Sequence, residues 1–205
     1  MGIDDAEVLQ RATAHLLALG HHRIAYIGGT AALPTAAARL RGFHAALAQA
    51  GLPEAAGPVY LGPPESPEHG ADAVRRILAD PRPPTAVVTA SVQITQGVLD
   101  ELPAQGVSIP ADLSIVGFGD EAGWSWWGPG LTTTRLPTER LASACALWLR
   151  NRLAETEASD DDRVARVLPT SLTVRGSTAP PPRAHRASLS RIAGGADRDP
   201  QEQSS

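Results

Sequence analysis

The sequence predicts an α/β fold, a parallel β-sheet with helices on both faces. Short, uninterrupted apolar runs alternate along the chain with longer segments whose apolar residues recur every three or four positions. Uninterrupted apolar runs are typical of strands buried on both faces of a parallel sheet, whereas the three- to four-residue period is typical of amphipathic helices. Strands that alternate with helices in this way predict βαβ units and therefore a parallel sheet.

The first predicted element is a helix from residue 5 to residue 19. Its apolar positions Val8, Ala12 and Leu16 recur at helical spacing, and Gly20 follows as a stop signal. The same alternation continues along the first half of the chain. Further helices are expected at 36–50, 67–79 and 94–105, and strands at 23–28, 58–61, 85–89 and 113–118.

The regular alternation ends at a loop, 119–130, that is rich in glycine and tryptophan. Beyond residue 177 the chain is rich in Pro, Arg, Ser and Asp and has no hydrophobic period. Such a composition cannot bury a core, so 178–205 is predicted to be a disordered tail. The elements expected between these two segments are strands at 131–134, 165–168 and 171–174, a helix at 139–153, and an acidic, exposed stretch at 155–163.

Composition and charge exclude several classes of protein. The 205 residues suit one domain, and the net charge of −4 with a pI near 5.8 lacks the basic surface that nucleic-acid binding requires. No signal peptide is recognisable, and no apolar run approaches the ~20 residues of a membrane span. Cys145 has no second cysteine to pair with and is predicted to be a small buried hydrophobe. We therefore expect a cytoplasmic protein without a membrane segment.

No enzyme, cofactor or metal site is expected. The chain lacks the G-x-S-x-G elbow of hydrolases, the phosphate-binding G-x-x-x-x-G-K loop and the dinucleotide-binding GxGxxG. His21 and His22 are adjacent at the start of a strand, so they point to opposite faces, and no third metal ligand lies near them in sequence. The run Asp160–Asp162 lacks the glycine and the final Glu of a calcium loop.

Six phrases, in order along residues 2–177, resemble those of one protein family. They are HLLALGHHRIAYIGG from His15, RLRGF from Arg39, PTAVV from Pro84 with Gln93 and Gly97, IPADLSIVGFGD from Ile109, PGLTTT from Pro129, and LPTSLTVRGST from Leu168. Together they are similar to the LacI/GalR family of bacterial transcription regulators. The sensor of that family is a two-lobed module similar to periplasmic binding proteins.

The resemblance implies a sensor domain over 1–177. Its C-terminal lobe would take about 5–131 and 164–177, and about 132–163 would be a remnant of the N-terminal lobe. The resemblance further implies a homodimer and a small effector, a sugar or a related molecule. Contact with DNA would come only through an N-terminal helix-turn-helix that is missing from this chain. The expected function is therefore the ligand-sensing part of an N-terminally truncated regulator, which controls operator binding.

The resemblance also indicates which residues contact the effector. The expected effector-binding residues are Thr35, Arg39, Ser91, Gln93, Asp120 and Trp124. They follow predicted strands, and ligands of open parallel sheets bind beyond the carboxyl ends of the strands. The guanidinium of Arg39 suits two adjacent sugar hydroxyls or a carboxylate. The chain departs from the family at Ser91–Val92, where relatives usually carry Asn-Asp, and at Gly119, where they carry Asp. A carboxylate acceptor is lost, so the effector's identity stays open.

Three of these residues have a structural alternative. Arg39 is also placed for an ion pair on the helix surface, and Asp120 for capping the helical turn that follows it. Trp124 offers an aromatic face that suits a sugar ring, but its loop resembles one near the family's subunit interface. Trp126 and Trp127, in the same loop, are predicted to lie at that dimer interface.

The helix at 139–153 is expected to have an uncovered apolar face, because the rest of its lobe is missing. Leu141, Cys145, Trp148 and Leu149 lie on or near that face. Each large apolar side chain contributes about 1.5–3 kcal/mol when buried, so the isolated chain is expected to be marginally stable or prone to aggregation. The alternative functions are a periplasmic-type solute-binding protein and a non-functional or dimer-competing regulator fragment.

Overall fold

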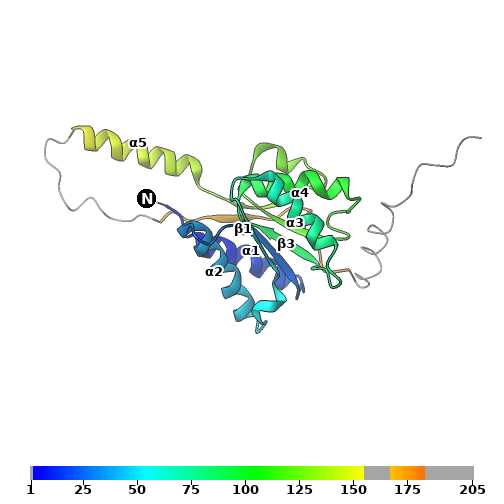
Figure 1. The fold of residues 1–205 in the computed structure, drawn as a ribbon. Helices are drawn as coiled ribbons and strands as arrows, with labels where there is room; N and C mark the ends of the chain where they lie inside the picture. Colours follow the sequence, from blue (N-terminus) through cyan, green and yellow to red (C-terminus); the bar gives the residue numbers. More distant parts are fainter. Residues whose placement is uncertain (1, 155–166, 183–205) are drawn as a thin grey trace, which may run out of the picture.

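In the computed structural model, which describes residues 2–154 and 167–182, the strands form one sheet covered by helices (Figure 1). The strands are β1 (Ile24–Gly29), β2 (Val59–Gly62), β3 (Ala86–Thr89), β4 (Ser114–Phe118), β5 (Thr132–Arg135) and β6 (Ser171–Thr173). Their order is β2-β1-β3-β4-β5-β6; the first five are parallel, and β6 runs antiparallel to β5. The predicted parallel sheet is confirmed, with an antiparallel edge strand that the apolar pattern did not distinguish.

Helices cover both faces of the sheet. They are α1 (Asp5–Ala18) and α2 (Pro34–Gln49) on one face, α3 (Pro67–Leu78) and α4 (Val92–Ala104) on the other, α5 (Thr138–Ala154), and the short 3₁₀ helices η1 (Glu54–Ala56) and η2 (Ala122–Ser125). The predicted helices all occur. α4 begins earlier than predicted because Ser91 caps it: the Ser91 Oγ accepts a hydrogen bond from the backbone N–H of Ile94 at 3.2 Å.

Each face of the sheet has its own hydrophobic core. Ile24 and Tyr26 of β1 point into the core beneath α1 and α2, with Phe43 of α2. Ala25 and Ile27 of the same strand point into the core beneath α3 and α4. Successive strand residues face opposite sides, so a strand buried on both faces requires the uninterrupted apolar run seen in the sequence.

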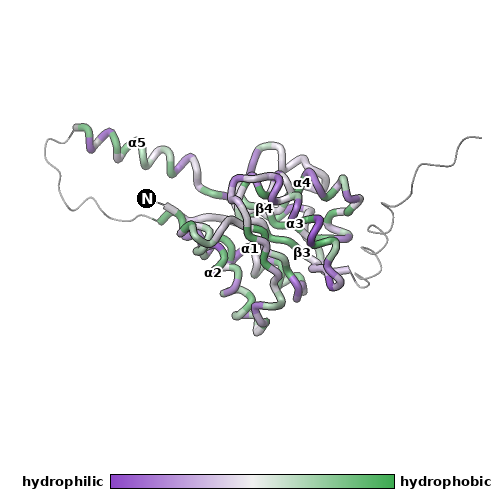
Figure 2. The backbone as a smooth tube through the Cα atoms, in the orientation of Figure 1, coloured by the Kyte–Doolittle hydropathy of each residue, from purple (hydrophilic) through white to green (hydrophobic). Residues whose placement is uncertain are grey.

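α5 extends away from the packed layers (Figure 1), and apolar residues lie along it (Figure 2). The side chains of Leu147, Trp148 and Leu149 are about half exposed, and that of Leu153 is 80% exposed. Of the apolar residues predicted to be uncovered, Trp148 and Leu149 are exposed, whereas Leu141 is partly buried. Cys145 is exposed as well. The prediction that it is buried is wrong, because α5 projects beyond the layers that would cover it.

The first lobe boundary differs from the prediction. We expected the sheet of the C-terminal lobe to end at residue 131, but β5 pairs with both β4 and β6. The chain therefore leaves the sheet after Arg135. The acidic stretch 155–163, with Asp160–Asp162, lies outside the described residues. Of the strand expected at 165–168, Val167 forms an isolated bridge with Gly2.

The start of the predicted tail also differs. Thr178 Oγ1 lies 3.0 Å from Nε2 of His15, and the backbone N–H of Ala179 donates to Ser114 Oγ at 3.1 Å. These contacts attach the segment after β6 to α1 and β4, so a disordered tail does not begin at residue 178. Residues 183–205 lie outside the described part.

His21 has a structural role, as predicted. It is buried, with Nδ1 2.7 Å from Thr85 Oγ1 and Nε2 2.8 Å from the carbonyl oxygen of Ala179. Within residues 2–154 and 167–182, no group of three His, Cys, Asp or Glu side chains is arranged to hold a metal ion. In the same residues no helix is long and apolar enough to cross a bilayer.

Candidate functional site

The carboxyl ends of the parallel strands meet at one edge of the sheet, and several predicted effector residues lie there. Thr35 and Arg39 are on α2, which follows β1, Ser91 follows β3, and Asp120 follows β4. We call the edge formed by these residues the carboxyl edge. The sequence predicts their proximity because parallel strands end on the same side of a sheet.

Arg39 joins three elements through one guanidinium. Its Nε donates to Oδ1 of Asp5 on α1 at 2.7 Å, and its Nη1 donates to the carbonyl oxygen of Ala90 after β3 at 2.7 Å. The guanidinium carbon lies 4.1 Å from the ring centroid of Phe118, the last residue of β4. Within the described residues, Nη2 donates no hydrogen bond, so donor capacity remains for a ligand.

The ion pair considered as an alternative for Arg39 is present, but it is not an exposed pair on one helix. It connects α2 to α1, and the side chains of Arg39 and Asp5 are only 19% and 14% exposed. The sequence analysis did not single out Asp5. Asp5 lies in the first turn of α1, where a negative charge interacts favourably with the helix N-terminus, so its place in the sequence has a local explanation that does not point to Arg39.

Tyr26 lies next to this ion pair and contains an unusual polar atom. Its hydroxyl is buried and has no hydrogen-bond partner in the described part of the chain. Burial raises the pKa of the Tyr26 phenol, an effect that the positive charge of Arg39 opposes and the negative charge of Asp5 reinforces. The ring occupies the space above Gly28, where a Cβ would overlap it. Gly28 is therefore needed for this packing, and the sequence alone did not indicate it.

The hydroxyl groups of Ser91 and Thr35 differ in whether they are available to a ligand. Ser91 is buried, and its Oγ donates to the carbonyl oxygen of Pro64 at 2.5 Å while it accepts from the N–H of Ile94. This hydroxyl holds the loop after β2 against the start of α4. Thr35 is exposed in the first turn of α2. Of the two, Thr35 has the hydroxyl that is open to a ligand.

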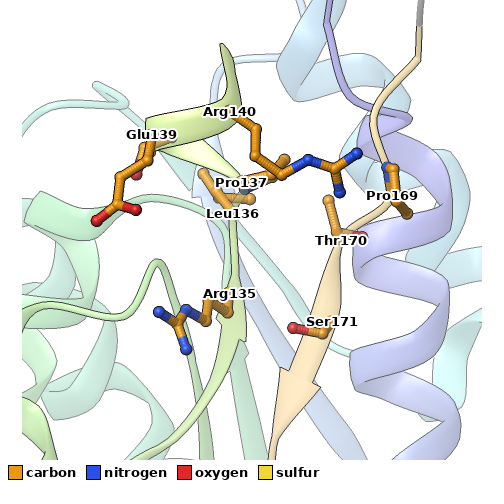
Figure 3. Close-up of a pocket in the computed structure, with 9 residues that line it drawn as sticks. Arg135, Leu136, Pro137, Glu139, Arg140, Pro169, Thr170 and Ser171 are labelled. Atoms are coloured by element: carbon orange, nitrogen blue, oxygen red, sulfur yellow. The ribbon is translucent and has the colours of Figure 1, made fainter. Parts of the chain in front are cut away.

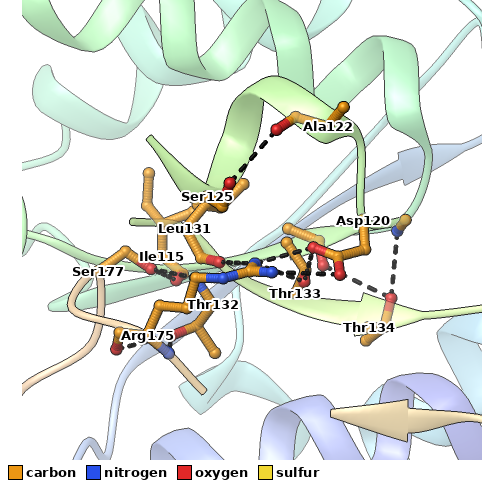
Figure 4. A network of polar contacts seen from close by, with 12 residues as sticks. Ile115, Asp120, Ala122, Ser125, Leu131, Thr132, Thr133, Thr134, Arg175 and Ser177 are labelled. Carbon is orange, nitrogen blue, oxygen red and sulfur yellow. Dashed lines mark hydrogen bonds and ion pairs between the residues drawn. The ribbon is translucent and has the colours of Figure 1, made fainter. Parts of the chain in front are cut away.

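Asp120 is bonded inside the protein (Figure 4). Its Oδ1 accepts from Arg175 Nη1 and from Thr133 Oγ1, both at 2.8 Å, and its Oδ2 accepts from Arg175 Nη2 at 3.2 Å. Burial raises the pKa of Asp120, but the hydrogen bonds from Arg175 and Thr133 outweigh it and hold the pKa below its ordinary value. The capping alternative is wrong, because the N-cap position of η2 is Glu121 and no side chain caps this helix. Sequence reasoning missed Arg175, which lies after β6, far from Asp120 along the chain.

Gln93 and Trp124 lie together in a groove between α4 and η2. The groove has a volume of about 540 Å³, and Trp127 also lines it. Trp124 is 5% exposed and belongs to the core beneath α3 and α4, whereas Trp126 is 86% exposed. No hydrogen bond in the described residues joins Gln93 or Trp124 to Arg39. The groove, which we call the α4–η2 groove, is also lined by Val92 and Glu121, which directly follow Ser91 and Asp120, so it adjoins the carboxyl edge.

Comparison with known proteins agrees with this architecture. A family profile described as a periplasmic binding protein-like domain matches residues 13–178. The HTH-type transcriptional repressor CytR of Escherichia coli K12 is 30% identical over 177 residues, which cover 86% of this chain and 50% of the repressor. The chain belongs to the periplasmic-binding-protein-like family, as an effector-binding domain of the LacI/GalR type.

Other relatives of this LacI/GalR-type domain show the same relationship. The transcriptional regulator GalR of Salmonella typhimurium LT2 is 33% identical over 146 residues, covering 71% of this chain and 42% of the regulator. The chain therefore spans about half the length of the curated relatives that it matches. These relatives are transcription regulators and not enzymes, in agreement with the absence of catalytic motifs.

Solved structures confirm the fold. A LacI family regulator from Enterococcus faecium with bound ribose superimposes with a TM-score of 0.76 at 28% identity, covering 87% of this chain and 64% of that one. A LacI regulator from a Rhodococcus species gives a TM-score of 0.76 at 32% identity, with coverages of 88% and 64%. The mostly parallel sheet with helices on both faces is thus the fold of the LacI-type sensor.

Proposed function

We propose that this domain senses a small, sugar-like effector at the carboxyl edge and controls the operator affinity of a longer regulator that carries a helix-turn-helix. The observation that carries the proposal is the position of Arg39, which contacts α1 and the ends of β3 and β4 with a single side chain. The ribose-bound Enterococcus faecium relative supports a sugar as the ligand. A cytoplasmic location and a homodimer are part of the same proposal.

The chemistry of the edge suits a hydroxylated ligand. The Arg39 guanidinium is a rigid set of donors that matches two adjacent oxygens, and its Nη2 remains available. Asp5 lies beside it as an acceptor, and the exposed hydroxyl of Thr35 lies on the same helix as Arg39. A ligand that contacts Arg39 would therefore bridge α1, α2 and the strand ends.

Such a bridge offers a physical route to regulation. A ligand shifts a conformational equilibrium only to the extent that it binds one state better than the other. Because Arg39 contacts several elements, a ligand bound to it interacts differently with arrangements in which these elements are closer or farther apart. In a regulator with DNA-binding heads, that difference would change the operator affinity.

The experiment is a calorimetric titration of the chain with a panel of pentoses, hexoses and nucleosides. For the compound that binds most tightly, Arg39→Gln should weaken binding about tenfold or more, as expected for loss of a charge-assisted hydrogen bond. Arg41→Gln is the matched control, because Arg41 is exposed on the same helix. Thr35→Val tests the same edge without breaking the ion pair to Asp5. Equal affinity of all variants, or no binding by any compound, would contradict the proposal.

A further inference from the structure

The hydroxyl of Tyr26 is a buried donor close to the Arg39–Asp5 pair. Tyr26 is fully buried in the core beneath α1 and α2, and its ring packs against that of Phe43 with a centroid separation of 5.2 Å. Its hydroxyl has no hydrogen-bond partner in the described part of the chain. Buried polar groups are nearly always hydrogen-bonded, so an exception such as this one calls for a specific explanation.

The hydroxyl lies at the carboxyl edge. Gly28 is two residues further along β1, on the same face of the sheet, and a Cβ on it would overlap the Tyr26 hydroxyl. Directly after the neighbouring strand β3, the N–H of Ala90 donates to the carbonyl oxygen of Ile27 at 2.9 Å, and the carbonyl oxygen of Ala90 accepts from Arg39 Nη1 at 2.7 Å. The phenol and the guanidinium therefore lie above the ends of adjacent strands, on the face covered by α1 and α2.

The Arg39–Asp5 pair leaves hydrogen-bonding capacity on both partners. Nε of Arg39 donates to Oδ1 of Asp5, and no hydrogen bond to Nη2 of Arg39 or to Oδ2 of Asp5 is found among residues 2–154 and 167–182. Burial raises the pKa of the Tyr26 phenol, the charge of Arg39 lowers it, and the charge of Asp5 raises it. The phenol is therefore protonated at neutral pH and within electrostatic reach of the Asp5 carboxylate.

The arginines at the start of α5 lack such a carboxylate. Arg135 and Arg140 line a cavity of about 500 Å³ between the end of β5 and the first turn of α5, where they point to opposite sides (Figure 3). Neither forms an ion pair within the described residues, so movement of either side chain leaves no buried carboxylate without a partner. Arg39 differs, because a ligand that draws its guanidinium away also removes the donor of Asp5, whose side chain is only 14% exposed.

We propose that Tyr26 is a positioning residue of the carboxyl edge, whose hydroxyl donates to the Asp5 carboxylate when an effector engages the guanidinium of Arg39. This inference rests on the proposed sensing function and adds an exchange of partners to it. In this structure Asp5 accepts from Arg39 and the hydroxyl is unpaired. With the effector bound, Arg39 turns to the ligand and the hydroxyl satisfies Asp5. The new hydrogen bond exists only in the bound arrangement, so it contributes to effector affinity.

The first test needs no ligand. In the unaltered chain, Tyr26→Phe should lower the equilibrium constant of unfolding in urea about fivefold, because it removes an unpaired buried hydroxyl. In an Arg39→Met background, which has no cation for Asp5, the same substitution should raise that constant about fivefold, because the hydroxyl then bonds the carboxylate. The matched control is Tyr60→Phe, in the core beneath α3 and α4, whose effect should not depend on Arg39.

Arg39→Gln is a second background, for use if circular dichroism shows that Arg39→Met does not fold. A neutral amide holds the Asp5 carboxylate less strongly than a guanidinium does, so the stabilisation by Tyr26→Phe should shrink or reverse in this background. If Tyr26 has only a packing role, Tyr26→Phe stabilises the domain equally with and without the Arg39 charge. Equal stabilisation in the unaltered chain and in a folded Arg39 variant overturns the proposal.

Calorimetry with ribose, glucose and adenosine separates this inference from the proposed function. For each compound that binds the unaltered chain, Tyr26→Phe should weaken binding about fivefold although it stabilises the domain, whereas Tyr60→Phe should leave the affinity unchanged. Unchanged affinity in Tyr26→Phe overturns the inference and leaves the proposed function standing. If none of the three compounds binds, the proposed function fails, while a reversed effect of Tyr26→Phe in the Arg39→Met background still supports the exchange of partners at Asp5.

Discussion

Replacing Arg175 by methionine should destabilise the domain by about 2–3 kcal/mol. The guanidinium of Arg175 binds both carboxylate oxygens of Asp120 and also donates to the carbonyl oxygen of Leu131 at 2.6 Å. Removing one partner of a fully buried pair costs about 3–5 kcal/mol, because the other charge is left without compensation. The side chains of Asp120 and Arg175 are 13% and 20% exposed, so solvent screens part of this loss and the lower figure applies.

The assay is urea unfolding at neutral pH, followed by tryptophan fluorescence and circular dichroism. Trp124 is a suitable probe, because it is buried in η2, close in sequence to Asp120. A double-mutant cycle with Asp120→Asn separates the pairwise energy from the effect of each substitution. Arg41→Met, which alters an exposed arginine, is the control for the loss of charge. An exposed ion pair contributes only about 0.5 kcal/mol to stability. If Arg175→Met lowers the free energy of unfolding by less than this, the idea of a buried, stabilising network is refuted.

The pH dependence gives an independent check of the same pair. The pKa of Asp120 is lower in the folded protein than the value of about 3.9 expected in the unfolded chain. Its ionised form is therefore favoured by folding, and the resulting stability is present above the unfolded pKa and is lost as the pH falls through the folded pKa. The difference in the free energy of unfolding between the unaltered chain and Arg175→Met should consequently be largest near pH 7 and become smaller below about pH 4.

Three further outcomes are expected. Tyr26→Phe should raise the free energy of unfolding by about 1 kcal/mol, because it removes a buried hydroxyl that has no hydrogen-bond partner among the described residues; a lower free energy of unfolding in urea would show that the hydroxyl is hydrogen-bonded in solution. Trp126→Ser should weaken self-association about tenfold in sedimentation equilibrium, since Trp126 is 86% exposed beside the α4–η2 groove, whereas Leu61→Ser, at an exposed residue of β2, should not. Gluconate should bind the carboxyl edge no more tightly than glucose in calorimetry, because Asp5 and Asp120 already neutralise Arg39 and Arg175; tighter binding of gluconate would contradict this.

The periodic pattern was sufficient to predict the order of helices and strands, because that order depends on local physical constraints. A strand such as β1 is buried on both faces and must be apolar throughout, and a helix such as α1 needs one apolar side. The orientation of β6 was not predictable in this way. Its three residues, Ser171–Thr173, are partly exposed, so their pattern does not specify whether the strand runs parallel or antiparallel to its neighbour.

The partners of the candidate residues required the structure. The Arg39–Asp5 pair joins residues 34 positions apart, and the Arg175–Asp120 pair joins residues 55 positions apart. Contacts over such separations depend on how the helices pack and on where the chain returns to the sheet. Likewise, the position of Trp124 in the core follows from the packing of η2 against α4, which a loop rich in glycine and tryptophan does not reveal.

At the carboxyl edge, position and ligand preference are determined by different features of the sequence. The position follows from the parallel strands, which bring Arg39, Ser91 and Asp120 to the same side of the sheet. The preference depends on which hydrogen-bonding groups stay available after folding, and most of those on Ser91 and Asp120 are already used. A ligand at this edge must therefore use Nη2 of Arg39 and the hydroxyl of Thr35, or exchange an existing bond for a new one. Relatives that differ only in these internal partners would accordingly share the fold and the location of the site while binding different compounds.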